Sequence, residues 1–152
     1  MQNRQGWIRI LVVALVMSGC AVRPPEAPVE PMTASVELEG SPAMALLQRA
    51  ESARQQGQGA AAERYLERAL NIAPDSSWLY RELADLRLSE GDARGAEGFA
   101  LKALRLAPDH DDYQASLWEM VATARERQGD RDGARDARRR AAALRNPVAR
   151  PV

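Results

Sequence analysis

The chain repeats itself at an interval of 34 residues, and this interval constrains the fold more than any other feature. The stretch at 65–76 reads YLERALNIAPDS, and the stretch at 99–110 nearly copies it as FALKALRLAPDH. Their prolines, Pro74 and Pro108, are therefore 34 residues apart. A fixed period of this length is typical of arrays of helix pairs, in which each unit buries its apolar face against its neighbours. We therefore expect an all-α solenoid.

Small residues recur at the same interval. Gly57 and Gly91 are 34 residues apart, and Gly129 has the corresponding place in a third copy of the repeat, whose spacing is shifted. Glycine adopts the left-handed conformation that ends many helices, so each of the three is expected at the bend inside a helix pair. Together with recurring alanines such as Ala69 and Ala103, this pattern resembles the tetratricopeptide repeat (TPR) family.

The resemblance implies three repeats of two helices each, at 43–76, 77–110 and 115–146, within a TPR domain at 43–146. The helices are expected near 43–56, 60–72, 77–90, 94–106, 111–128 and 131–145. Ser41 and Pro42 supply an N-cap and a first-turn proline for the first helix. Asp109 or Asp111 is expected to cap the fifth.

The N-terminal residues 1–19 are typical of an export signal. Arg4 and Arg9 make the first nine residues basic, and the apolar run ILVVALVM follows at 10–17. That run is too short for a permanent transmembrane helix, which needs about 20 residues. We expect a signal peptide at 1–19 and an exported chain.

The only cysteine of the chain follows this signal. The sequence Met17-Ser18-Gly19-Cys20 resembles the lipobox of bacterial lipoproteins, which implies cleavage before Cys20 and lipidation of that residue. Ala21 replaces the Asp that in this family favours the inner membrane, so the resemblance implies a lipid anchor in the outer membrane, facing the periplasm. The alternatives are an ordinary cleaved signal with a coincidental cysteine, or a short inner-membrane anchor.

We expect residues 20–42 to comprise the lipidated cysteine that the resemblance implies and a proline-rich linker. The stretch at 21–42 reads AVRPPEAPVEPMTASVELEGSP, without a helical period. Such a composition favours an extended, disordered tether over a folded unit. Residues 147–152 are expected to form a short tail.

The sequence offers little for catalysis. His110 is the sole histidine, and its PDHDD surroundings are better explained by a hydrated loop than by a weak cation site. No nucleophile motif or phosphate loop is present, so we expect no enzyme, no catalytic residue, no metal, no cofactor and no small-molecule substrate. The formal net charge of zero and the export signal argue against nucleic acid. The arginines of 131–145 fit the solvated face of an end helix; the alternative is a basic surface for an acidic partner or anionic lipid headgroups.

Function is therefore expected to come from protein binding. In TPR proteins the first helices of the repeats line a concave face, and the resemblance places eleven candidate residues on it: Leu47, Glu51, Arg54, Gln55, Trp78, Arg81, Asp85, Leu88, Glu119, Thr123 and Arg127. Trp78 with Arg81 and Arg54 stands out, because Trp and Arg are enriched in binding hot spots. Packing between helices explains Trp78 equally well.

A lipid-tethered TPR module on a proline-rich linker resembles, in layout, the outer-membrane lipoproteins that activate class A penicillin-binding proteins, the bifunctional peptidoglycan synthases. The resemblance implies that the chain docks on such a synthase and activates it. The alternative is a pilotin-like or scaffold lipoprotein that assists assembly of an outer-membrane complex.

Overall fold

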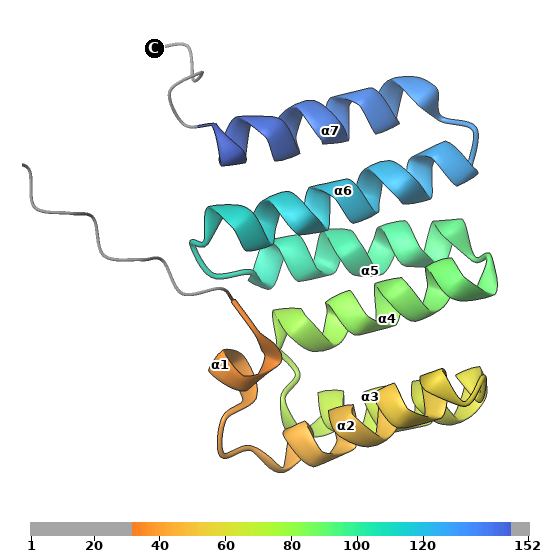
Figure 1. Ribbon diagram of the computed structural model, residues 1–152, viewed down its shortest axis with the longest axis vertical. Helices are drawn as coiled ribbons and strands as arrows, with labels where there is room; N and C mark the ends of the chain where they lie inside the picture. The colour runs from red at the N-terminus through yellow and green to blue at the C-terminus, as the bar shows by residue number, and fades with distance from the viewer. Residues whose placement is uncertain (1–31, 147–152) are drawn as a thin grey trace, which may run out of the picture.

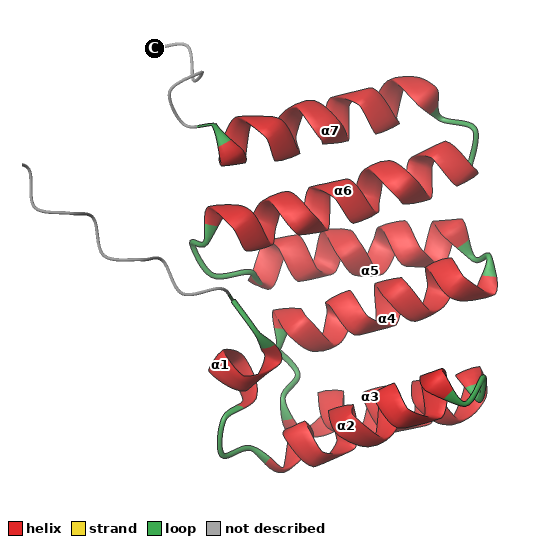
Figure 2. Ribbon diagram, in the orientation of Figure 1, coloured by secondary structure: helices red, strands yellow, loops and turns green. Residues whose placement is uncertain are grey.

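The computed structural model describes residues 32–146, which form helices joined by short loops and contain no strand (Figure 2). The helices are α1 (Ala34–Leu38), α2 (Pro42–Gln55), α3 (Gly59–Ile72), α4 (Ser77–Glu90), α5 (Ala93–Leu106), α6 (Asp111–Arg127) and α7 (Arg131–Arg145). The predicted signal peptide, Cys20, the first part of the predicted tether and the predicted tail lie outside these residues.

Helices α2 to α7 form three antiparallel pairs that are stacked in chain order (Figure 1). The turns inside the pairs lie at one edge of the stack, and the corners between pairs lie at the opposite edge. Each pair packs against its neighbours along the chain, as expected for a solenoid. The expected all-α fold of three helix pairs is confirmed.

The turns inside the pairs use glycine as the sequence predicts. Gly57, Gly91 and Gly129 have φ of 72°, 84° and 84°, a region in which a side chain would be strained. After Gly91, the Asp92 carboxylate accepts a hydrogen bond from the Gly95 amide at 2.9 Å and caps α5. The same glycine–aspartate pair ends α6 and caps α7. In each of these two turns, the glycine ends one helix and the aspartate that follows it caps the next.

Alanine allows the helices of neighbouring repeats to approach closely. Ala84, Ala100, Ala122 and Ala137 come from α4, α5, α6 and α7, and all four are fully buried in one cluster with Val121. The first two repeats are joined instead by leucines, including Leu47, Leu66, Leu79, Leu83 and Leu86. Core contacts thus run through the whole described array.

Ion pairs also join successive repeats. Arg87 of α4 pairs with Glu63 of α3, and Arg125 of α6 pairs with Glu97 of α5 at 2.7 Å. The two pairs occupy equivalent places in their repeats, and all four side chains are less than a third exposed. They fix the spacing between one repeat and the next.

The structure differs from the sequence prediction at two places. Residues 34–38, expected in the disordered linker, form α1, because Leu38 is buried at 2% exposure against the first repeat. The N-cap of α6 is His110, and not Asp109 or Asp111. Its Nδ1 accepts a hydrogen bond from the Tyr113 amide at 3.3 Å, which is the bond that an Asp cap would make.

Glu37 fixes α1 to the start of α4. Its carboxylate accepts hydrogen bonds from the Ser77 hydroxyl at 2.7 Å and from the Trp78 amide at 3.2 Å. These bonds satisfy donors at the positive end of the α4 dipole. The end of the predicted tether is therefore part of the folded domain.

We expect Glu37→Ala to lower the free energy of unfolding by about 1–3 kcal/mol, because it removes hydrogen bonds to a charged acceptor. Amide hydrogen exchange should accelerate at Trp78 and along α1. The matched control is Glu39→Ala, which removes an exposed carboxylate just after α1. Equal effects of the two variants would contradict the capping role of Glu37.

Candidate protein-binding face

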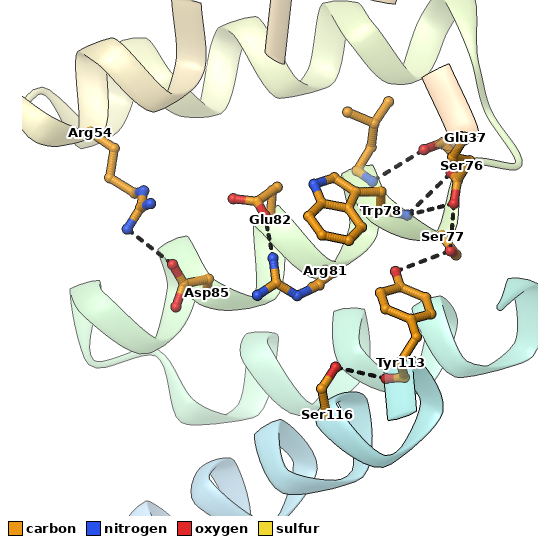
Figure 3. A network of polar contacts seen from close by, with 11 residues as sticks. Glu37, Arg54, Ser76, Ser77, Trp78, Arg81, Glu82, Asp85, Tyr113 and Ser116 are labelled. Atoms are coloured by element: carbon orange, nitrogen blue, oxygen red, sulfur yellow. Dashed lines mark hydrogen bonds and ion pairs between the residues drawn. The ribbon is translucent and has the colours of Figure 1, made fainter. Parts of the chain in front are cut away.

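The first helices of the three pairs, α2, α4 and α6, carry the residues that the sequence predicts for binding. We call the surface formed by Arg54, Trp78, Arg81, Asp85 and Glu119 the inner face (Figure 3 shows its central part). The helix pattern places these side chains on the same side of their helices, because they are three or four residues apart or in equivalent repeats.

Arg54 and Asp85 join α2 to α4 across the inner face. The Arg54 guanidinium lies 3.0 Å from the Asp85 carboxylate, and the two side chains are 42% and 40% exposed (Figure 3). An exposed pair of this kind contributes little to stability, about 0–1 kcal/mol. Both charges are accessible to a partner.

Trp78 belongs to α4, and its ring faces α6. Its ring stacks on Tyr113, with centroids 5.6 Å apart and ring planes 8° from parallel. The Arg81 guanidinium lies 4.7 Å from the Trp78 ring centroid, a cation–π arrangement. The Trp78 side chain is half-buried, and its buried Nε1 has no hydrogen-bond partner within residues 32–146. Trp78 thus both packs between helices and contributes to the surface.

Glu82 is a buried charge beside this cluster. Only 7% of the residue is exposed, and the Arg81 guanidinium lies 2.5 Å from its carboxylate. Burial raises the pKa of the Glu82 carboxyl above its ordinary value of 4.5, the Arg81 charge opposes the rise, and the Asp85 charge adds to it. Arg81 therefore touches both the indole and the buried carboxylate.

The raised pKa has a consequence for stability. The folded chain holds the Glu82 proton more tightly than the unfolded chain, so the contribution of Glu82 to stability falls as the pH rises from 4.5 through the raised pKa. We expect Glu82→Gln to raise the melting temperature at pH 7 and to leave it unchanged at pH 4. Glu67→Gln, at an exposed position of α3, is the control. A lower melting temperature of the Glu82 variant at pH 7 would contradict this sign.

A chain of hydrogen bonds continues from Tyr113 to α1. The Tyr113 hydroxyl lies 3.1 Å from the Ser77 hydroxyl, which donates to Glu37 at 2.7 Å (Figure 3). Burial raises the pKa of Tyr113 to about 12, so the phenol stays protonated at neutral pH. These hydrogen bonds hold α1, α4 and α6 together at this end of the inner face.

The third repeat contributes a more charged part of the inner face. Glu119 of α6 pairs with Arg145 of α7 at 3.0 Å, and Glu126 pairs with Arg138 at 2.6 Å. The Thr123 hydroxyl donates to the Glu119 carbonyl within the helix. These ion pairs are exposed, so they too can be exchanged for contacts with a partner.

One predicted binding residue is buried, and two buried residues that support the inner face were not predicted. Leu47 is only 1% exposed and belongs to the core, so it offers no contact surface. Glu82 and Tyr113 were missed, although each contacts a predicted residue, Arg81 or Trp78. The remaining predicted residues stay accessible at least in part: Glu51, Arg54, Gln55, Trp78, Arg81, Asp85, Leu88, Glu119, Thr123 and Arg127. Arg127 also donates to the Leu88 carbonyl.

No group of three or more His, Cys, Asp or Glu side chains within residues 32–146 could hold a metal ion. None of the helices in this part of the chain has the length and apolar character needed to cross a membrane.

Comparison with known proteins identifies the repeat. The family model described as tetratricopeptide repeat matches residues 53–117. The globular C-terminal domain of LpoP from P. aeruginosa is 42% identical, with a TM-score of 0.64, over 66% of this chain and 95% of that domain. The N-terminal domain of stress-induced protein-1 from C. elegans has the same TM-score over 67% of this chain and 83% of its own length, but at 18% identity it shares only the fold. No curated protein sequence matches.

Proposed function

The chain belongs to the tetratricopeptide repeat family, and from that premise we propose that it is a periplasmic lipoprotein that docks on a class A penicillin-binding protein and activates it in cell-wall synthesis. The domain itself is a protein-interaction module. The partner, the lipid anchor at Cys20 and the outer-membrane location are the proposed part.

The observation that carries the proposal is the Trp78–Arg81 cluster on the inner face. An indole, a guanidinium 4.7 Å from its centroid and a second guanidinium on Arg54 are the side chains most often found at binding hot spots. They lie on a rigid support, because Trp78 also stacks on Tyr113. A preorganised surface of this kind loses little entropy on binding.

Two similarities support the choice of partner. The sequence layout, with an export signal, a lipobox and a tether before the repeats, resembles the lipoprotein activators of class A synthases. The match to LpoP covers almost the whole of a globular domain that is C-terminal in its own protein. At 42% identity this match extends beyond the fold to the sequence.

Because α1 is part of the folded domain, the tether is shorter than the sequence predicts. Only the twelve residues from 20 to 31 remain between the proposed anchor and the described domain. Fully extended, they span about 40 Å at roughly 3.3 Å per residue. The proposal therefore requires the synthase to approach the lipid anchor to within this distance plus the size of the domain.

The test uses the full chain in detergent and a purified class A synthase from the same bacterium. We expect the two proteins to co-purify and the rate of glycan polymerisation to rise with the concentration of the chain until it saturates. Absence of both binding and rate change would remove the proposal. A normal synthase with defective secretin multimers in a deletion strain would favour the pilotin-like alternative instead.

A further inference from the structure

A second surface lies at the edge of the array, away from the turns inside the pairs. There, α1 lies beside the corners that lead from α3 to α4 and from α5 to α6 (Figure 1). Together they enclose a groove of about 450 Å³. We call it the edge groove, and its lining residues are Met32, Val36, Glu37, Asp75, Leu106, Pro108, Asp109 and His110.

The edge groove has an apolar floor and is supported by the fold. Met32 and Leu106 contribute aliphatic surface, and Val36 is 62% exposed, the most exposed large hydrophobic residue found within 32–146. The α1 wall is held by buried Leu38 and by the hydrogen bonds of Glu37 to the start of α4. A volume of this size lies in the range of pockets that bind ligands, about 300–1,000 Å³.

The rim of the edge groove is acidic. Glu37, Asp75 and Asp109 place three carboxylates on it, and its lining contains no Lys or Arg. The ion pairs found within residues 32–146 involve none of these three. The Glu37 carboxylate already accepts hydrogen bonds from Ser77 and Trp78, so the exposed Asp75 and Asp109 are the rim charges that a cation can reach. Negative charge beside an apolar floor attracts a cation more strongly than the same charge surrounded by water.

We propose that the edge groove binds an extended segment of a partner protein in which an apolar side chain is adjacent to Arg or Lys. The apolar side chain packs against Met32, Val36 and Leu106. The methylene stem of the basic residue lies along the same floor, and its charge reaches the Asp75 and Asp109 carboxylates. The acidic rim repels anionic segments. This site goes beyond the proposed function, because it lies at the edge of the array and does not depend on the synthase.

The test is a titration of the isotope-labelled full chain, in neutral detergent, with the peptide acetyl-Leu-Arg-Leu-Arg-amide followed by NMR. We expect saturable changes in chemical shift at the lining residues of the edge groove. The peptides acetyl-Leu-Glu-Leu-Glu-amide and acetyl-Ser-Arg-Ser-Arg-amide, which lack the positive charge or the apolar side chains, should bind at least about fivefold more weakly.

Variants of exposed residues locate the binding without unfolding the domain. Val36→Ser and the double variant Asp75→Asn, Asp109→Asn should each weaken binding of the Leu-Arg peptide by about fivefold or more. The controls are Ile72→Ser, which removes an exposed hydrophobic residue outside the groove, and Glu67→Gln. Neither control should change the affinity.

Several outcomes would overturn the proposal: no shift changes with the Leu-Arg peptide, equal binding of the acidic peptide, shift changes confined to the inner face, or unchanged affinity of both groove variants. None of these would bear on synthase binding, which is tested separately with variants of Arg81.

Discussion

Replacing Leu79 by Ala will lower the free energy of unfolding by about 2–5 kcal/mol, a large fraction of the stability of a domain of this size. Leu79 is fully buried on α4, in the cluster that joins the first two repeats. Removal of its side chain leaves a cavity between α4 and the first helix pair. Because each repeat contacts only its neighbours, hydrogen exchange should accelerate more in α2 and α3 than in α7.

Urea unfolding followed by circular dichroism measures this loss. The control is Leu88→Ala on the same helix, where the side chain is half-buried and should cost clearly less. If both variants lost the same stability, or if exchange accelerated equally in all three repeats, the assignment of Leu79 to the junction of the first two repeats would be wrong.

The second large effect concerns binding. We expect the double variant Arg81→Ala, Glu82→Gln to bind a class A synthase at least about 30-fold more weakly, which corresponds to about 2 kcal/mol. Arg81 is the residue that contacts both Trp78 and Glu82. The Gln at position 82 is included because Arg81→Ala alone would leave a buried carboxylate without its partner.

The double variant separates binding from folding. Its melting temperature should be close to that of the unchanged chain, so a loss of affinity reports on the inner face. Arg105→Ala on α5, an exposed arginine on a second helix of a pair, is the matched control and should bind normally. Normal binding of the double variant would exclude Arg81 from the interface.

The repeat and the helix boundaries could be predicted because their signals are local. Gly91 followed by Asp92 ends one helix and caps the next through bonds that span only a few residues. The 34-residue period then transfers such a signal from one repeat to another. Small residues such as Ala100 recur with the same period, and they allow neighbouring helices to approach closely.

Other features depend on contacts between distant residues and could not be read from the sequence. Helix α1 has only five residues, too few for a helical period, and it forms because Leu38 and Glu37 find partners in α2 and α4. The burial of Leu47 and Glu82 follows from the packing between the first two repeats, which a repeat pattern does not specify. Tyr113 was missed because it lies in the four residues inserted before the third repeat.

The central claim is that the inner face on α2, α4 and α6 binds the partner. Hydrogen–deuterium exchange of the full chain, with and without a class A synthase, tests it most directly. We predict slower exchange around Arg54, in the first half of α4 and around Glu119, with no change along the outer side of α7. Protection confined to α3, α5 or α7, or no protection at a saturating concentration of the synthase, would contradict it.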